Sequence, residues 1–218
     1  MKDSGITWLG QIPAHWNVVR LKYLFRVVGG GTPSKDKPEY WNGDIPWVSP
    51  KDMKQERVVD TEDHITEEAV LESTSTLIQP GAALVVCRSG ILKHSIPVAI
   101  NEVELALNQD MRAFIARGSM TANYLKWLIW ANQDALLAEW SKSGATVESL
   151  ELDLMLNSTL PVPPVSEALA ITNWTEHITV GTNEVKRSIQ EGITTLQARR
   201  SALIDEAVTG QLKYARES

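Results

Sequence analysis

The last quarter of the chain most constrains the fold, because a proline-rich segment precedes a long segment that contains no proline. Residues 160–164, Leu-Pro-Val-Pro-Pro, cannot lie inside a helix, since proline fixes φ and lacks a backbone donor. From Ser166 onward only glycines interrupt a helix-compatible sequence. The pattern predicts one helix of about 40 residues, which at about 1.5 Å per residue would be about 60 Å long.

Apolar residues recur along this helix at heptad spacing, which is typical of a coiled-coil seam. A helix of this length exceeds what a domain of this size needs for its own core, so the seam predicts a partner. An ordinary core helix with a coincidental period is the alternative. Two interleaved series form the seam: Ile171, Ile178 and Val185 in one, and Thr182, Ile189, Leu196 and Leu203 in the other.

The end of the helix resembles a known family. Residues 196–212, LQARRSALIDEAVTGQL, resemble the closing segment of a conserved region in type I restriction-modification specificity subunits, and the proline-rich entry resembles the start of that region. In that family the subunit reads DNA, while methylation and cleavage subunits do the chemistry. One departure is that the family usually has Glu-Gln just after the proline run, whereas here Glu167 has no Gln beside it.

Motifs earlier in the chain extend the resemblance over nearly its whole length. Residues 8–16, WLGQIPAHW, resemble the family's opening, and we expect the two tryptophans to act as a hydrophobic clasp on the core. The pattern G-x-T-P-S at residues 30–34, followed by Glu-Tyr-Trp at 39–41, resembles the start of a target recognition domain. GDIPWVSPKDM at 43–53 and NQDMR at 108–112 also resemble the family.

The resemblance implies an α/β (α+β) fold with two parts. Residues 1–160 would form a DNA target recognition domain with a small mixed sheet and helices. Residues 161–218 would form the long coiled-coil helix, for spacing and dimerisation. Full specificity subunits carry two recognition domains and two such helices, whereas this chain has one of each, so it resembles a half-subunit, either natural or truncated.

Local patterns predict individual elements in the first half of the chain. Alternating basic and apolar residues over 18–28 predict a short helix with a basic face, and the glycines after it predict a loop at 29–35. Asn42-Gly43 predicts a turn, and residues 45–49 a short strand with an edge-type proline.

The second half of the domain gives clearer signals. Thr66 is a candidate N-cap of a short helix, and Thr121 caps a long helix from Ala122 to about Lys142, ended by residues 143–146. Three tryptophans in that long helix indicate a heavily buried element. Apolar runs predict strands at 82–87, 96–100 and 111–115.

Composition limits the compartment and the partners. The lone Cys87 excludes an internal disulfide framework and a Cys-rich zinc site. No apolar run approaches the roughly 18 residues of a membrane span, so the cytoplasm is the expected compartment and no membrane is expected. The net charge is −6, but residues 1–60 carry nine Lys/Arg against seven Asp/Glu. Residues 61–170 carry six against fourteen.

The sequence predicts no catalytic residue, no metal and no cofactor. Val162-Pro163-Pro164-Val165 lacks the polar and aromatic flanks of an adenine methyltransferase loop, and the glycine loop lacks P-loop spacing. Asp44, Asp52 and Lys54 form the nearest nuclease-like set, whose loose spacing is common by chance. The four histidines are scattered.

Polar residues in or beside the predicted loops are the candidate DNA contacts, because binding residues concentrate in loops. We expect them on one rim of the recognition domain, with Arg88 and Gln109 at base edges and Lys35 and Lys51 at phosphates. The predicted set comprises Thr32, Ser34, Lys35, Lys51, Arg88, Lys93, Gln109 and Arg112.

The expected partners are double-stranded DNA, the methyltransferase subunit and possibly the restriction subunit. With one helix per chain, we also expect a homodimer through Ile171, Ile178, Val185, Ile189, Leu196 and Leu203, and with it an inverted-repeat target. The alternative is a coiled-coil assembly or inhibitory fragment that does not bind DNA, which the acidic balance of residues 61–170 favours.

Overall fold

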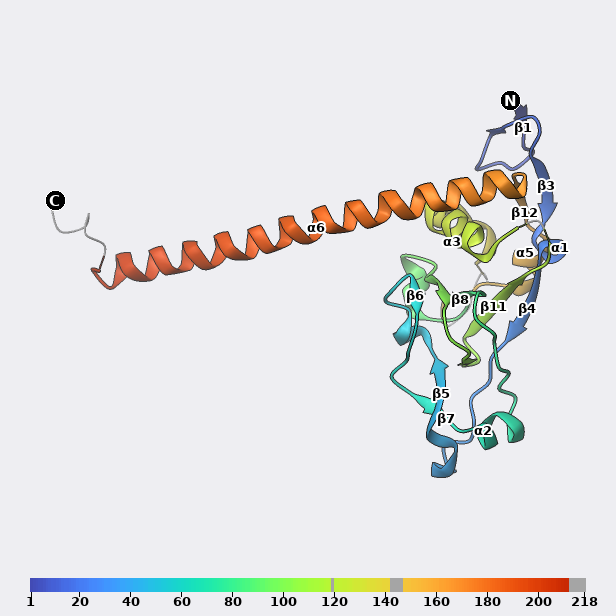
Figure 1. The fold of residues 1–218 in the computed structure, drawn as a ribbon, viewed down its shortest axis with the longest axis horizontal. Helices are drawn as coiled ribbons and strands as arrows, with labels where there is room; N and C mark the ends of the chain where they lie inside the picture. The colour runs from blue at the N-terminus through green and yellow to red at the C-terminus, as the bar shows by residue number, and fades with distance from the viewer. Residues whose placement is uncertain (119, 142–146, 212–218) are drawn as a thin grey trace. The chain divides into compact units, whose positions relative to one another are not determined.

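A computed structural model describes residues 1–118, 120–141 and 147–211 of the chain (Figure 1). The chain divides into two compact units, Met1–Thr172 and Asn173–Ser218. The first is a mixed α/β domain and the second belongs to a long helix, which confirms the expected fold class. The expected functional boundary at residue 160 falls inside the first unit. No helix in the described ranges has the length and apolar character needed to cross a membrane.

A five-stranded sheet forms the centre of the first unit, in the order β4-β11-β8-β9-β6. Its strands are antiparallel except for the parallel pair β6–β9. The middle strand β8 is buried along its length, as its apolar run predicts. The three strands predicted from apolar runs are confirmed as β8, β9 and β11. The bounds are β4 Phe25–Gly29, β6 Arg57–Val58, β8 Ala83–Val86, β9 Val98–Asn101 and β11 Met111–Ala116.

A second sheet has the order β10-β5-β7, with β10 at Ala106–Leu107, β5 at Trp41–Val48 and β7 at His64–Ile65. The predicted turn at Asn42-Gly43 is wrong, because both residues lie inside β5. Asn42 has φ of 61° at the point where the register with β7 shifts, so the Asn-Gly pair forms a bulge. Pro46, predicted to be an edge-type proline, instead lies in β5, the middle strand of this sheet. Its lack of an N–H does not interrupt the β5–β10 pairing, because that pairing begins only at Trp47.

The predicted helix over residues 18–28 is also wrong. The segment forms β3 (Asn17–Arg20), a single helical turn α1 (Leu21–Leu24) and then β4. Strand β3 pairs with β12 (Thr159–Val162), which comes from the proline-rich segment, while β4 pairs with β11. Both partners are distant in the sequence, so tertiary pairing overrides the local preference.

The predicted helix from Ala122 to about Lys142 is two helices, α3 (Ala122–Ala131) and α4 (Gln133–Trp140). The break is at Asn132, whose side-chain Nδ2 donates to Leu128 O at 2.8 Å. The Thr121 N-cap is confirmed, because its hydroxyl accepts from Tyr124 N at 3.1 Å. The predicted end of this helix, near Lys142 and residues 143–146, lies outside the described residues.

The expectation of a heavily buried element, drawn from the three tryptophans of this segment, holds for two of them. Trp127 and Trp140 are buried, whereas Trp130 is 58% exposed. Trp127 and Trp130 meet edge to face at 5.8 Å between ring centroids. The exposed ring of Trp130 therefore rests on a buried one.

The remaining elements are short. Thr66 caps α2 as predicted, with its hydroxyl accepting from Ala69 N at 3.2 Å. The other bounds are β1 Lys2–Asp3, β2 Gln11–Ile12, α2 Glu67–Glu72 and α5 Leu152–Asn157, with 3-10 turns η1 Pro38–Tyr40, η2 Pro50–Asp52 and η3 Gly90–Lys93.

The long helix α6 spans Val165–Val208, 44 residues, close to the predicted length. Its first two turns belong to the first unit, where Ala168 and Thr172 are buried. In this part Glu167 accepts a hydrogen bond from Trp16 Nε1 at 2.7 Å and lies 2.7 Å from His15 Nε2. The opening motif therefore holds the start of α6 through a carboxylate.

This arrangement predicts a pH-dependent contribution to stability. The hydrogen bonds from Trp16 and then His15 lower the pKa of Glu167. A carboxyl whose folded pKa is depressed adds stability that is present above its unfolded pKa and is lost as pH falls through the folded pKa. We expect the unfolding free energy of wild type to decline more steeply than that of Glu167→Gln between about pH 5 and about pH 3.

The measurement is chemical denaturation across that pH range. Glu184→Gln, which removes an exposed carboxylate farther along α6, is the control and should follow the wild type. Parallel plots of unfolding free energy against pH for wild type and Glu167→Gln would show that the contacts of Glu167 with Trp16 and His15 add no charge-dependent stability.

Candidate nucleic-acid interface

One end of the five-stranded sheet brings together loops that are far apart in the sequence. Arg112 lies opposite Gly29, so the end of β4 meets the start of β11. Met111 lies opposite Val86, so the end of β8 reaches the same place, and β9 begins there too. Strand β5 joins this end because its last residue, Val48, accepts from Asn108 N at 2.9 Å. We call this end of the domain the rim.

All eight predicted DNA-contact residues lie in segments that enter or leave the rim. Thr32, Ser34 and Lys35 follow β4, and Lys51 follows β5 in η2. The connection between β8 and β9 carries Arg88 and Lys93, and the start of β11 carries Gln109 and Arg112. The eight residues thus lie on segments that begin or end at the rim.

The loop at residues 30–35 is held by two tryptophans. Trp47 Nε1 donates to Gly31 O at 3.0 Å, and Trp41 Nε1 donates to Ser34 O at 3.1 Å. The two indoles meet edge to face with centroids 5.2 Å apart. Sequence reasoning did not assign them this role. The sequence feature that could have pointed to this role is that each of these tryptophans lies in a motif resembling the family.

Glycine allows this loop to lie directly on a neighbouring backbone. Gly31 N donates to Leu107 O at 2.8 Å. A Cβ at Gly30 would lie 2.1 Å from Asn108 O and 2.3 Å from Leu107 O, far inside van der Waals contact. The loop that carries Thr32, Ser34 and Lys35 therefore docks beside the start of β11 because residue 30 has no side chain.

Thr32, Gln109 and Arg112 form one polar cluster. The Thr32 hydroxyl donates to Gln109 Oε1. Arg112 Nη1 donates to Gln109 O at 3.0 Å and to Met111 O at 2.7 Å. Gln109 is exposed, and its Nε2 donor has no acceptor among the described residues. The cluster therefore presents an oriented amide with a donor still unused.

Two of the predicted cations are partly neutralised inside the rim. Lys51 Nζ lies 2.9 Å from Asp63 and 3.2 Å from Glu62, and the hydrogen bond with Asp63 raises the pKa of Lys51. Arg88 lies 2.6 Å from Asp110 through both Nε and Nη2. Their charges are oriented by these carboxylates, which reduces the net positive field of the rim.

Lys35 lies in a different setting. It shares a surface hollow of about 310 Å³ with Trp41, Trp47 and Asp63. Lys35 and Lys93 form no ion pair with a described residue. They are the rim lysines most available to an anionic ligand.

Asp52 and Cys87, the groups nearest to catalytic chemistry, have structural settings. The Asp52 carboxylate accepts from Ser49 N and Ser49 Oγ, both at 2.8 Å, and thereby caps η2. Burial raises the pKa of the Cys87 thiol to about 12, which disfavours a thiolate nucleophile. Within the described ranges, no three His, Cys, Asp or Glu residues group in a way that could hold a metal ion.

The second unit is the continuation of α6 from Asn173. Five of the six predicted partner-helix residues are exposed on it: Ile178, Val185, Ile189, Leu196 and Leu203. The sixth, Ile171, lies in the first unit and is partly buried against the core. Leu196 and Leu203 also line a shallow groove with Arg199, Arg200, Ile204 and Ala207. The seam is thus an uncovered apolar stripe along the second unit.

Comparison with known proteins identifies relatives over most of the chain. The family model described as "Type I restriction modification DNA specificity domain" matches residues 13–195. The specificity subunit of the type I restriction enzyme EcoR124I/EcoR124II from Escherichia coli is 40% identical over 166 residues, which cover 76% of this chain and 40% of that protein. The MjaIX specificity subunit from Methanocaldococcus jannaschii is 32% identical over 164 residues, or 74% of this chain and 37% of that protein.

Solved structures show the same fold at low identity. A chain from a type I R-M system, studied for complex assembly and conformational transition, matches with a TM-score of 0.74 and 17% identity, covering 91% of this chain and 47% of that one. The HsdS subunit from Thermoanaerobacter tengcongensis matches with a TM-score of 0.66 and 17% identity, covering 94% and 47%. The chain spans less than half the length of each of these relatives.

The docking of the glycine loop predicts a position-specific loss of stability. Gly30→Ala places a Cβ against two carbonyl oxygens, so we expect a loss of about 1–3 kcal/mol in unfolding free energy, typical of overpacking. Gly90→Ala is the control, because nothing lies within 4 Å of its added Cβ. Denaturant unfolding of both variants measures the difference. Equal stabilities would contradict the close approach.

Proposed function

Since the chain belongs to the family of type I restriction modification DNA specificity domains, we propose that it is the DNA-reading subunit of such a system. It recognises one half of a bipartite target on double-stranded DNA and performs no chemistry itself. The observation that carries this proposal is the rim, where the separate segments that carry the eight polar residues begin or end.

The rim residues suit two kinds of contact. Gln109 offers an oriented amide whose Nε2 is unused, which fits pairing with an adenine edge. Arg88 is held at Nε and Nη2 by Asp110, so its remaining donors are those we assign to a guanine. Lys35 and Lys51 are suited to phosphates, which position the protein without reading sequence.

The chemistry belongs to other subunits in this proposal. The chain docks a methyltransferase subunit, and in the full system a restriction subunit, and works with them in the cytoplasm. The stripe of α6 is the proposed docking element, since it is apolar and exposed along the second unit. Some stripe residues would therefore contact the methyltransferase.

The same helix supports a homodimer. With one helix per chain, the stripe is covered most simply by a second copy in a closed two-fold pair. A two-fold axis inverts one recognition domain relative to the other, so both read the same short sequence on opposite strands. Half-sites about 34 Å apart, one duplex turn, fit a helix of this length.

A coiled-coil assembly fragment that does not bind DNA is the competing function. Residues 61–170 favour it, because they carry six Lys/Arg against fourteen Asp/Glu. The two functions differ in their dependence on salt, since DNA binding weakens steeply as salt rises.

We expect rim substitutions to separate sequence reading from phosphate binding. Arg88→Ala should relax preference at one base pair, a loss of about 1–3 kcal/mol for the preferred base. Lys35→Gln should weaken all duplexes alike and reduce the salt dependence by about one phosphate contact. Selection from a random duplex pool, with filter binding at two salt concentrations, measures both effects with the chain and its methyltransferase subunit.

Lys2→Gln, which removes an exposed charge from β1, is the control for charge alone. Equal, sequence-blind losses from Arg88→Ala and Lys35→Gln would contradict the assignment of base and phosphate contacts. Salt-independent association of the wild type would favour the assembly fragment instead.

The dimer predicts a strict dependence on the apolar stripe. Replacing Ile189 and Leu196 by Lys should give a monomer in sedimentation while the first unit stays folded. Val180→Lys is the matched control, because Val180 is equally exposed but lies on the opposite side of the helix, about 200° from Ile178 at about 100° per residue. If the wild-type chain is monomeric at micromolar concentration, both alone and with the methyltransferase subunit, the proposed dimer and the inverted-repeat target are both wrong.

A further inference from the structure

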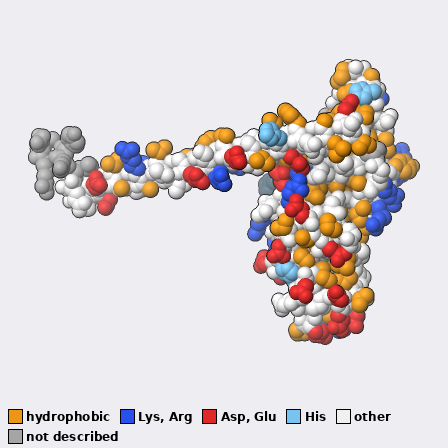
Figure 2. Space-filling model, viewed as in Figure 1, with side chains coloured by type: hydrophobic (Ala, Val, Ile, Leu, Met, Phe, Trp, Pro, Cys, Tyr) orange, Lys and Arg blue, Asp and Glu red, His pale blue; other side chains and the backbone are white. Residues whose placement is uncertain are grey.

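A group of unpaired cations lies at the opposite end of the sheet from the rim. We call it the basic edge, and it comes from β3, α1, β4 and the residue that follows β11. Arg20, Arg26 and Arg117 are exposed, and Lys22 is partly buried. Figure 2 shows basic side chains gathered over this side of the domain, beside α1 and β4. The basic edge comprises Arg20, Lys22, Arg26 and Arg117.

The backbone brings these four residues together. Arg26 lies opposite Ile115 in the β4–β11 pair, two residues before Arg117 on the same strand face. Arg117 N donates to Leu24 O at 2.7 Å, which places the end of β11 against the turn that carries Lys22. Arg20 ends β3, immediately before that turn.

No described carboxylate pairs with any cation of the basic edge. Lys22 Nζ donates only to the amide oxygen of Asn157, at 2.8 Å. Helix α5, which packs against α1, carries Asp153, and no ion pair joins Asp153 to the four cations. The basic edge is therefore a concentration of uncompensated positive charge.

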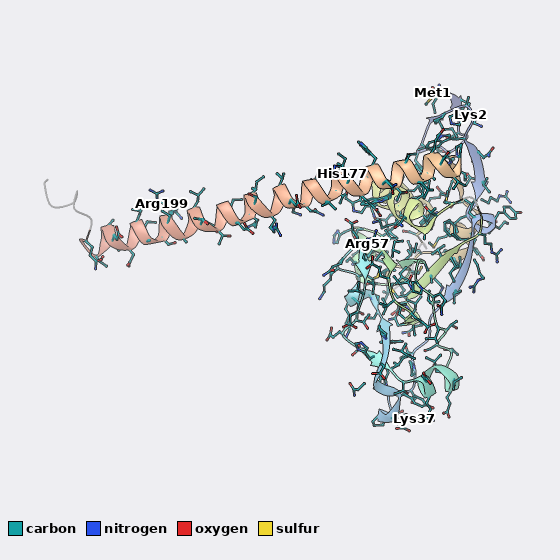
Figure 3. All side chains as sticks on the ribbon, in the orientation of Figure 1. Met1, Lys2, Lys37, Arg57, His177 and Arg199 are labelled. Carbon is teal, nitrogen blue, oxygen red and sulfur yellow. The ribbon has the colours of Figure 1, made fainter. Side chains whose placement is uncertain are left out.

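Elsewhere in the first unit, five of the described cations are paired with carboxylates, although Lys35 and Lys93 are not. Lys37 lies 3.0 Å from Glu72 and Arg57 lies 2.7 Å from Glu102, at the positions labelled in Figure 3. Lys126 lies 3.0 Å from Glu56, and the rim cations Lys51 and Arg88 are paired as described above. In a chain of net charge −6, free positive charge at one place is a distinguishing feature.

The surroundings of the basic edge favour a polyanion over a protein surface. Stable protein interfaces have an apolar core depleted in charge. Here Tyr23, 65% exposed, lies beside the cations with its ring 5.4 Å from Lys22 Nζ, and the basic edge itself comprises four charged side chains. Arginines without an apolar core fit the closely spaced phosphates of a nucleic-acid backbone.

We propose that the basic edge binds the phosphodiester backbone of the duplex that flanks the bases met by the rim. This inference rests on the proposed DNA-reading function. Arg112 at the rim and Arg117 at the basic edge are separated by the length of β11, about 17 Å at about 3.4 Å per residue. That is about half of a 34 Å duplex turn, so one duplex reaches both surfaces.

The basic edge would then supply much of the affinity without reading sequence. Each phosphate neutralised adds about 0.9 to the slope of log affinity against log salt. Four such contacts would add about 3.6, whereas the paired lysine and arginine of the rim already have partners. With affinity supplied by the basic edge and base reading by the rim, a chain of net negative charge can bind DNA.

The test compares the full chain with Arg26→Gln/Arg117→Gln on random-sequence duplex of about 40 base pairs, titrated with salt. We expect the salt slope of the variant to fall by about 2 and its affinity to drop at low salt. The base preference of the variant, read by selection from the same pool, should match the wild type. Lys2→Gln/Lys186→Gln removes the same charge elsewhere and should keep the wild-type slope.

The outcomes distinguish this inference from the function on which it rests. An unchanged slope with intact base preference overturns the basic edge and leaves DNA reading in place. A wild type that binds duplex without base preference removes the proposed function, whatever the variant does. A wild type that binds no duplex at low salt overturns both. If the variant binds DNA normally but no longer associates with the methyltransferase subunit, the basic edge is a protein-docking surface and the inference fails.

Discussion

The close approach of two backbones is the constraint on which the candidate interface depends. Gly30 and Gly31 lie so near Leu107 and Asn108 that a single Cβ at residue 30 would overlap two carbonyl oxygens. Because of this approach, the loop after β4 reaches the start of β11, and Thr32 meets Gln109. The indoles of Trp41 and Trp47 then hold the loop carbonyls. Without this contact the polar residues of the two segments would not form one surface.

Charge is distributed unevenly over the first unit. At the rim, carboxylates orient two of the cations, as Asp110 does for Arg88, which defines their position and partly neutralises their charge. At the basic edge, the cations have no carboxylate partner among the described residues, so their charge is uncompensated there. Side chains held in one orientation are suited to discriminating between bases, whereas cations without carboxylate partners are suited to attracting phosphates. In the proposed function, the rim would therefore read bases and the basic edge would hold phosphates.

The long helix α6 is buried only at its beginning. Its first two turns bury Ala168 and Thr172 in the core of the first unit, and from Asn173 onward its apolar residues are exposed. A helix cannot bury its own stripe, so this stripe favours the helical partner that we propose for it. The carboxylate of Glu167, held by Trp16 and His15, ties the beginning of this element to the domain.

Several features followed from the sequence alone, because they depend on neighbouring residues. Helix α6, the caps at Thr66 and Thr121, the buried strand β8 and the family motifs are of this kind. The predicted contact residues were chosen as loop residues between apolar elements, which required no knowledge of the pairing between strands. Their roles at the DNA remain predictions.

Other features were decided only by tertiary structure. Residues 18–28 read locally as a helix, yet become β3 and β4 because β12 and β11 offer distant partners. Asn42-Gly43 reads as a turn, but pairing with β7 makes it a bulge within β5. The basic edge was hidden for the same reason: Arg117 comes close to Lys22 only after β11 pairs with β4. Local sequence determines what a segment prefers, whereas strand pairing over long separations determines which segments meet.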